Sequence, residues 1–317
     1  ALTLEPDLDN ANVGRIYNRI IKHVPKGACF FISWKLNNYS GGIEMKKVLT
    51  IAGSDSSGGA GIQTDLKTFA AIGVYGMSAI TAITAQNTLG VKRVERVSAS
   101  MVKDQIRAVF EDIEVDAVKI GMLSEIDIIE AVRDCMDIYR PPFVVLDPVM
   151  VSTSGFDLLN SQAKRSLLEG LIPLVDLITP NLAETACILS LIGRGGLLVN
   201  SCERMEEAGR IIAGHTGKNV LIKGGHLLDR PCDVLVTSDG RVRSYDHKRI
   251  ATKNTHGTGC TLSSAIAANV AKGYDLEEAV FRAKDFISMA IENSLDIGRG
   301  CGPTNPMGEI YKSLGMV

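Results

Sequence analysis

The stretch Asn254-Thr255-His256-Gly257-Thr258-Gly259-Cys260-Thr261 joins an extended polar segment to the alanine-rich run 262–271. Its two glycines, Gly257 and Gly259, let the backbone approach a ligand without an intervening side chain. The alanine-rich run predicts a helix, whose unpaired first N–H groups and positive dipole end would face the same loop. The stretch therefore predicts an anion site, and phosphate is the natural occupant of such a site.

Cys260 stands where this loop becomes the predicted helix. A thiol at a helix N-terminus is expected to have its pKa lowered, which would make Cys260 a candidate proton acceptor beside a bound phosphate. The alternative from these residues alone is an ordinary glycine loop before a packed helix, with Cys260 as a small core side chain.

The composition is that of a globular protein with a sizeable core, since 45% of the 317 residues are hydrophobic. A formal net charge of -2 implies no basic face, so we expect neither nucleic acid nor a membrane as a partner. The cysteines are scattered and include no C-x-x-C pair. This spacing argues against a disulfide framework or a zinc site and favours a reducing, cytoplasmic location.

Residues 1–44 show no clear period, whereas Met45-Lys46-Lys47 opens a strong strand pattern. We interpret Met45 as a natural start and residues 1–44 as an extension outside a single domain over 45–317. A small helix or strand that packs on the main domain is the alternative interpretation of residues 1–44.

Short apolar runs alternate with helical patterns from Lys47 onward. The runs typical of buried strands are 48–52, 77–83, 117–120, 143–146, 176–179 and 220–223, followed by a hairpin over 233–237 and 242–251. Helical spacing covers 62–70, 101–112, 124–138 and 276–291, with Asp275 as the expected cap of the last helix. Strands that are apolar throughout, separated by helices, predict a mostly parallel sheet covered on both faces.

Polar residues and glycines follow these predicted strands, where ligands gather in such sheets. They include Gly53, Gln86, Gly121, Asp147, Asn181, Glu184, Lys223 and Gly224. Any one of them is ordinary loop chemistry, but their joint placement predicts a ligand site at one edge of the sheet.

Three motifs carry a resemblance to a known family: Thr50 to Lys67 (TIAGSDSSGGAGIQTDLK), Lys119 to Met122 (KIGM) and Asn254 to Cys260. They resemble the hydroxymethylpyrimidine/phosphomethylpyrimidine kinases of the ribokinase-like superfamily, over about Met45 to Pro306. The resemblance implies an α/β protein with the three-layer α/β/α ribokinase-like fold and a mostly parallel central sheet. It also implies ATP- and Mg²⁺-dependent phosphorylation of 4-amino-5-hydroxymethyl-2-methylpyrimidine, then of its monophosphate, in thiamine biosynthesis by a homodimer.

The resemblance assigns roles position by position. The residues implied to bind the pyrimidine are Gly53, Asp65, Gln86, Met122 and Val149. Those implied to contact ATP and its phosphates are Asp147, Asn181, Glu184, Lys223 and Thr258, of which Asp147 and Glu184 would hold Mg²⁺ through water. The catalytic group would be Gly257, Gly259 and Cys260, with Cys260 accepting the proton of the alcohol. Many superfamily members carry Asp at that position, so a thiol is a weaker candidate base.

Other interpretations of these residues stay open. By itself Asp65 suits a solvated helix face, Met122 suits core packing, and Asn181 with Glu184 suits a helix start after Pro180. A pyridoxine/pyridoxal kinase, alone or as a second activity, is the nearest rival, because the Gln86 amide both donates and accepts. A non-catalytic pyrimidine sensor is the other rival. Segment 84–97 is a candidate lid over the pyrimidine.

Overall fold

The computed structural model describes residues 45–316, apart from 151–158, 226 and 228–230. Residues Met45–Gly308 form one compact unit. The interpretation of residues 1–44 as an extension therefore lies outside the described residues. Within the described part of the chain, no helix is both long and apolar enough to cross a membrane.

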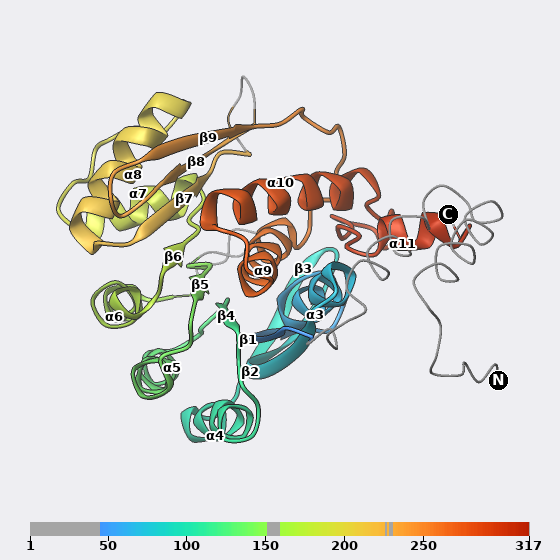
Figure 1. The fold of residues 1–317 in the computed structure, drawn as a ribbon, viewed down its shortest axis with the longest axis horizontal. Coiled ribbons are helices and arrows are strands. Elements are labelled where there is room, and N and C mark those ends of the chain that lie inside the picture. Colours follow the sequence, from blue (N-terminus) through green and yellow to red (C-terminus); the bar gives the residue numbers. More distant parts are fainter. Residues whose placement is uncertain (1–44, 151–158, 226, 228–230, 317) are drawn as a thin grey trace, which may run out of the picture. The chain divides into compact units, whose positions relative to one another are not determined.

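The described residues form a nine-stranded sheet with the order β3-β2-β1-β4-β5-β6-β7-β8-β9 (Figure 1). The strands are β1 (Lys47–Asp55), β2 (Tyr75–Asn87), β3 (Gly90–Arg96), β4 (Ala117–Ile120), β5 (Val144–Leu146), β6 (Leu177–Ile178), β7 (Asn219–Lys223), β8 (Cys232–Val236) and β9 (Val242–Asp246). Neighbours from β2 to β7 pair in parallel, whereas β3, β8 and β9 add antiparallel strands at the two edges. The prediction of a mostly parallel sheet is confirmed.

Successive residues of the central strands pack into two different cores. In β5, for example, Val144 and Leu146 belong to one buried cluster and Val145 to the other. Strand β4 repeats the pattern, with Val118 in the first cluster and Ala117 in the second. Because side chains alternate across a strand, a sheet covered on both faces favours apolar residues at successive positions.

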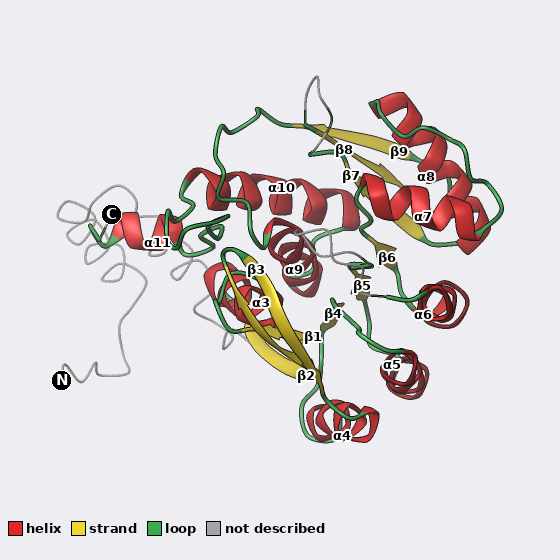
Figure 2. Cartoon of the chain, turned by 180° about the vertical axis from the view of Figure 1, so that it is seen from behind, coloured by secondary structure: helices red, strands yellow, loops and turns green. Residues whose placement is uncertain are grey.

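Helices cover both faces of the sheet (Figure 2). The first cluster contains residues of α4 (Ala99–Phe110), α5 (Ile126–Tyr139), α6 (Ser161–Ser166), the turns Leu167–Leu171 and Ile172–Leu174, α7 (Leu182–Leu191) and α8 (Cys202–Thr216). The second contains residues of α3 (Gly61–Ile72), α9 (Thr258–Ala271) and α10 (Leu276–Glu292). A last short helix is α11 (Gly308–Ser313). The three-layer α/β/α prediction is confirmed.

Segment 84–97 comprises the end of β2 and the antiparallel strand β3, and its role as a lid stays a prediction. The late hairpin is present, but its second strand ends at Asp246 rather than at residue 251. The cap of the last helix is as predicted, since Asp275 Oδ1 accepts a hydrogen bond from the Glu278 N–H at 2.9 Å.

Helix α9 is buried along most of its length, because it packs against β1, β4 and β5 and also against α3 and α10. This crowding explains its alanines, of which Ala265, Ala267 and Ala268 have no exposed surface. Small side chains let a helix approach several neighbours closely, at the densities typical of protein interiors.

We predict that Ala267→Leu lowers the free energy of unfolding by about 1–3 kcal/mol, because a buried site without space must be overpacked. Urea unfolding measures the change. The matched control is Ala108→Leu on the exposed face of α4, which should change stability by no more than about 0.5 kcal/mol. Equal effects of the two substitutions would contradict the packing described for α9.

Candidate active site

Two glycine loops touch each other at the carboxyl edge of the sheet. Gly257, the N-cap of α9, has φ 82°, and a Cβ at this position would collide with the Gly59 carbonyl oxygen. Gly61, the first residue of α3, has φ 56°, and a Cβ there would collide with the Gly53 carbonyl oxygen. Only glycine tolerates both the positive φ and the close backbone approach. The loops after β1 and before α9 are therefore held in direct contact.

This contact brings the N-termini of α3 and α9 to the same place. The Gly61 N–H, in the first turn of α3, donates toward the sulfur of Cys260, in the first turn of α9. Helix N-termini carry unpaired N–H groups and a partial positive charge. Two such ends around Cys260 form a stronger setting for an anion than the single helix end predicted from the sequence.

A buried ammonium lies under this position. Lys119 in β4 has no exposed side-chain surface, and its Nζ lies 2.9 Å and 3.0 Å from the two carboxylate oxygens of Asp65. Burial opposes its charge, but the carboxylate of Asp65, together with Cys260 and Asp147, outweighs burial and raises the pKa of Lys119. The side chain is therefore a fixed positive charge close to the Cys260 thiol.

Asp65 is fully engaged in this buried network. Besides Lys119, its carboxylate accepts hydrogen bonds from Thr50 Oγ1 at 2.6 Å and from Ser264 Oγ at 2.7 Å. Its side chain has no exposed surface. The Asp65 side chain thus points toward Lys119 in the interior and does not lie on a solvated face of α3. In this conformation it offers no surface to a ligand.

The expectation of a lowered pKa for Cys260 is wrong. Burial raises the pKa of this thiol, and the carboxylates of Asp65 and Asp147 raise it further. The Lys119 ammonium and the Gly61 N–H act in the opposite direction without overcoming burial. The sequence revealed the helix end but not the two carboxylates that other elements bring close to it.

Asp147, Lys223 and Gly259 meet at the same edge. Asp147 follows β5, and its Oδ1 lies 2.6 Å from Nζ of Lys223, the last residue of β7. A Cβ at Gly259 would lie 3.3 Å from both Asp147 Oδ2 and Lys223 Nζ. Gly259 therefore leaves the first turn of α9 open to this ion pair. Three residues far apart in sequence therefore meet at this edge of the sheet.

Asn181 and Glu184 begin α7 as a reciprocal capping box. The Asn181 Oδ1 accepts from the Glu184 N–H at 2.9 Å, and the Glu184 Oε2 accepts from the Asn181 N–H at 2.8 Å. The helix-start interpretation of this pair is therefore confirmed. Burial raises the pKa of Glu184 to about 7, with Lys223 lowering it and Asp147 raising it. Glu184 thus also belongs electrostatically to the Asp147–Lys223 group.

The residues implied to bind the pyrimidine have different neighbours in the structure. A Cβ at Gly53 would lie 2.7 Å from Met122 Cε, so these two residues are in contact. The Val149 N–H donates to the Asp147 carbonyl at 2.8 Å, which places Val149 beside the acidic group. Gln86 lies beside His256 rather than beside Asp65, with 3.2 Å between Gln86 Nε2 and His256 Nε2. The pyrimidine-binding role of these residues stays a prediction.

Asp55 and His256 link the two glycine loops, and the sequence analysis assigned neither of them a role. His256 Nε2 lies 2.8 Å from Asp55 Oδ2, and both residues are buried. Burial opposes charge on Asp55, but hydrogen bonds from His256 and Ser57 outweigh it and lower the pKa of Asp55 to about 2. Both residues stand inside the quoted motifs, and their position among the glycines could have identified them from the sequence.

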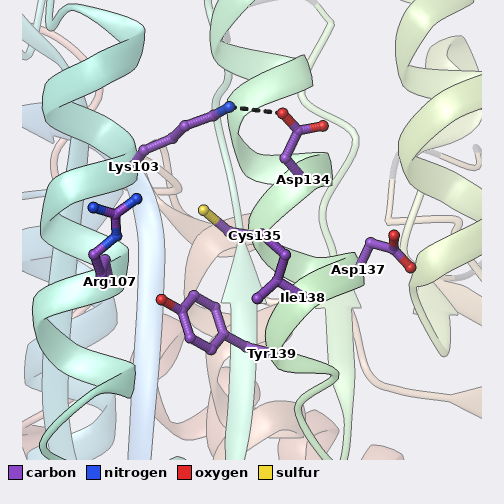
Figure 3. A pocket seen from close by; sticks show the side chains of 7 residues that line it. All are labelled: Lys103, Arg107, Asp134, Cys135, Asp137, Ile138 and Tyr139. Carbon is purple, nitrogen blue, oxygen red and sulfur yellow. Dashed lines mark hydrogen bonds and ion pairs between the residues drawn. The ribbon is translucent and has the colours of Figure 1, made fainter.

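Two surface hollows lie apart from this group. One, of about 300 Å³, lies between α4 and α5 and is lined by Lys103, Arg107, Asp134, Cys135, Asp137, Ile138 and Tyr139 (Figure 3). The other, of about 450 Å³, is lined by Phe143, Asn219, Thr237, Arg241, Arg243 and Asp275–Glu278. Neither contains a predicted site residue. The carboxyl edge of the sheet, where the charged groups converge, is therefore the candidate site.

Comparisons with known proteins indicate the family of this chain. The family model described as "Phosphomethylpyrimidine kinase" matches residues 55–305. The chain is 51% identical over 261 residues to the hydroxymethylpyrimidine/phosphomethylpyrimidine kinase of Rhizobium meliloti (strain 1021), covering 81% of this chain and 95% of that protein. It is 45% identical over 267 residues to the Haemophilus influenzae protein of the same name, covering 82% and 96%.

Two solved structures are similar as well. The phosphomethylpyrimidine kinase from Clostridium difficile 630 has 47% sequence identity and a TM-score of 0.68, covering 78% of this chain and 99% of that one. The ADP complex of Bacillus subtilis pyridoxal kinase has 39% identity and a TM-score of 0.76, covering 84% and 98%.

We predict that Lys119→Met slows alkylation of Cys260 at pH 8 by about tenfold or more, because removing an opposite charge raises a thiol pKa by at least about one unit. The sign follows from the ammonium, which lowers the pKa of Cys260 in the wild type. Mass spectrometry of the Cys260 peptide after timed iodoacetamide treatment measures the rate. Cys202, partly exposed on α8, is the internal control. An unchanged rate at Cys260 would show that the Lys119 charge does not act on this thiol.

Proposed function

The chain belongs to the phosphomethylpyrimidine kinase family, and on this premise we propose that it phosphorylates 4-amino-5-hydroxymethyl-2-methylpyrimidine and then its monophosphate. ATP would be the donor, and the diphosphate product would serve thiamine biosynthesis. The observation that carries this proposal is the convergence of two helix N-termini and the Lys119 ammonium around Cys260. Phosphoryl transfer needs positioning and charge stabilisation more than covalent chemistry, and this group of residues supplies both.

The backbone around Cys260 would hold the transferring phosphoryl group. Residues Gly257, Thr258 and Gly259 stand at the start of α9, where N–H groups lack partners within the helix. Such donors are fixed before the reaction begins, so they stabilise developing charge without reorganising. The Lys223 ammonium, close to Gly259, would neutralise charge on the nucleotide phosphates. The similarity to a pyridoxal kinase solved with ADP supports ATP as the donor.

Cys260 would accept the proton of the hydroxymethyl group as its oxygen attacks. Because burial raises the pKa of Cys260, only the fraction of thiolate present at a given pH can act as the base. Turnover should therefore rise with pH as this thiol ionises. A positioned base of this kind contributes about 10²- to 10⁴-fold to a rate.

The donor atoms at the carboxyl edge suit Mg²⁺, which prefers carboxylate oxygens and retains several waters. Asp147 raises the pKa of Glu184, so the two carboxylates repel each other and a cation between them would be stabilised. When bound, Mg²⁺ would supply positive charge to the nucleotide phosphates. Asp147 and Glu184 would hold it through water, while Lys223 neutralises Asp147 when the ion is absent.

A second activity on pyridoxal has specific support. Pyridoxal kinases from Bacillus subtilis and Staphylococcus aureus have TM-scores of 0.76 and 0.75 at 39% and 34% identity. The Gln86 amide can donate or accept, so it does not by itself exclude a pyridine. The pyrimidine remains the preferred substrate, because the family model and the curated relatives are pyrimidine kinases. A homodimer and a cytoplasmic location stay predictions from the family resemblance.

We predict ADP release by the wild-type protein with the pyrimidine alcohol and with its monophosphate, and slower release with pyridoxal. Cys260→Ala should reduce turnover by about 100-fold or more, while the KM for ATP changes little. Loss of the thiol should also remove the rise of turnover with pH. Turnover that stays near the wild-type value in Cys260→Ala would remove Cys260 from the role of base. If none of the three compounds yields ADP although ligands raise the Tm, the protein is a sensor instead.

We predict that Glu184→Gln raises the Tm of the metal-free protein at pH 8.5 but not at pH 5. The pKa of Glu184 is about 7 in the folded protein, above its ordinary value. The proton on the Glu184 carboxyl therefore stabilises the folded protein fully below about pH 4.5, and this stabilisation is lost as pH rises through 7. Gln stays neutral and can still complete the capping box. Thermal unfolding at several pH values measures the difference.

The Glu184→Gln variant also tests whether Glu184 helps to hold Mg²⁺. Mg²⁺ should raise the Tm of the wild type at pH 8.5 and raise that of Glu184→Gln less, because the ion would replace the lost proton. Glu292→Gln, at an exposed position near the end of α10, is the matched control. An equal response to Mg²⁺ in all three proteins would contradict a role for Glu184 at the metal.

A further inference from the structure

His256 is a buried imidazole that the proposed chemistry does not use. Its ring fills the space left by Gly59, where a Cβ would lie 2.5 Å from Cδ2 of the imidazole. One ring nitrogen, Nε2, lies 2.8 Å from Asp55 Oδ2 and 3.2 Å from the Gln86 amide. Since Gln86 is predicted to bind the pyrimidine, the state of this nitrogen bears on substrate recognition.

The surroundings of Asp55 determine where the imidazole proton lies. Asp55 Oδ1 accepts from the N–H and the hydroxyl of Ser57, and Oδ2 accepts from the N–H groups of Gly59 and Ala60. The pKa of Asp55 is about 2, so this carboxylate only accepts hydrogen bonds. The contact at 2.8 Å therefore requires a proton on His256 Nε2. The requirement holds for the neutral ring and for the imidazolium alike.

This proton selects one orientation of the Gln86 amide. A nitrogen that carries its proton toward Asp55 has no lone pair to accept from an amide NH₂, so the amide must turn its oxygen toward His256. The hydrogen bonds of Thr84 lead to the same orientation of the Gln86 amide. Its hydroxyl donates to the Ser54 carbonyl at 2.9 Å and lies 3.3 Å from the other end of the Gln86 amide. The Thr84 oxygen can then only accept from that end, which must be the NH₂ group.

We propose that Asp55 and His256 are positioning residues that lock the Gln86 amide, with its oxygen toward His256 and its NH₂ toward Thr84. The locked amide keeps one N–H donor and one oxygen lone pair for a ligand. A glutamine amide recognises adenine with the same two groups, its oxygen accepting from the exocyclic amino group and its NH₂ donating to a nearby ring nitrogen. A 4-aminopyrimidine presents that pattern, and pyridoxal does not. The inference rests on the proposed function and names the residues that make Gln86 selective.

The test is the preference of the enzyme for the amino group. The measured quantity is kcat/KM for the 4-aminopyrimidine alcohol divided by kcat/KM for the same alcohol with hydrogen in place of the amino group. The fraction of folded enzyme cancels in this ratio, so a merely structural defect leaves it unchanged. His256→Phe keeps a ring of similar shape and removes the N–H donor. We expect the ratio to fall about tenfold, as for one hydrogen bond whose geometry is lost.

Three further variants show whether His256 acts through Gln86. Gln86→Ala should lower the ratio by a similar factor, and the double variant His256→Phe/Gln86→Ala should lower it no further. His256→Gln, whose amide can still donate, should restore part of the preference. His215→Phe, at an exposed position of α8, is the matched control and should keep the wild-type ratio.

Two results with the variants would overturn the inference while leaving the proposed function intact. One is a wild-type ratio that survives in His256→Phe, and the other is a double variant whose loss is the product of the two single losses. A wild type that phosphorylates both alcohols equally well would also overturn it. A wild type that phosphorylates neither alcohol would overturn the proposed function, and the inference would fall with it.

Discussion

The ion pair between Lys119 and Asp65 is the interaction around which the site is organised. Neither side chain has exposed surface, and with Thr50 and Ser264 the pair joins β4 to α3, β1 and α9. Losing one partner of such a pair leaves a buried charge uncompensated, which costs about 3–5 kcal/mol. The sheet and the two helices whose N-termini surround Cys260 are thereby held in one arrangement. The same ammonium supplies fixed positive charge where a phosphoryl group would bind.

Backbone contact between glycines is the second constraint. There is no room for a Cβ at Gly257, which contacts the Gly59 carbonyl oxygen. The same holds for Gly61, which contacts the Gly53 carbonyl oxygen. The loops that follow β1 and precede α9 are about 200 residues apart in sequence, yet they touch without intervening side chains. As a result, one buried His–Asp contact between them is close enough to orient a side chain of β2, Gln86. The loop that would bind phosphate and the residue that would recognise the ring belong to one network.

The electrostatic balance of the site favours a neutral side chain at position 260. Asp65 and Asp147 both raise the pKa of Cys260, and a third carboxylate at that position would meet the same repulsion. A neutral thiol avoids this cost at rest. Its ionisation is favoured by the Lys119 ammonium, the Gly61 N–H and the Lys223 ammonium. The site thus keeps positive charge for the phosphates and limits the negative charge near the alcohol.

The sequence by itself determined the layers and the edge of the sheet that bears the site. Apolar runs such as Val144–Leu146 indicate burial on both faces, and periodic helices such as α10 indicate one buried face. These are local patterns, so they can be read without knowing which segments meet. The glycine motifs also pointed to an anion site at the start of α9. Strand β3 was missed because it is an exposed edge strand, with charged residues where a central strand would have apolar ones.

Only the tertiary structure decided the electrostatics. The pKa of Cys260 depends on Asp65 and Asp147, which stand 195 and 113 positions earlier in the chain (260 less 65, and 260 less 147). The orientation of Gln86 likewise depends on His256 and, through it, on Asp55. Coulomb interactions and hydrogen bonds act over a few ångströms of space and ignore separation along the chain. A motif can therefore name the residues of a site before anything reveals which of them carry charge or which way they face.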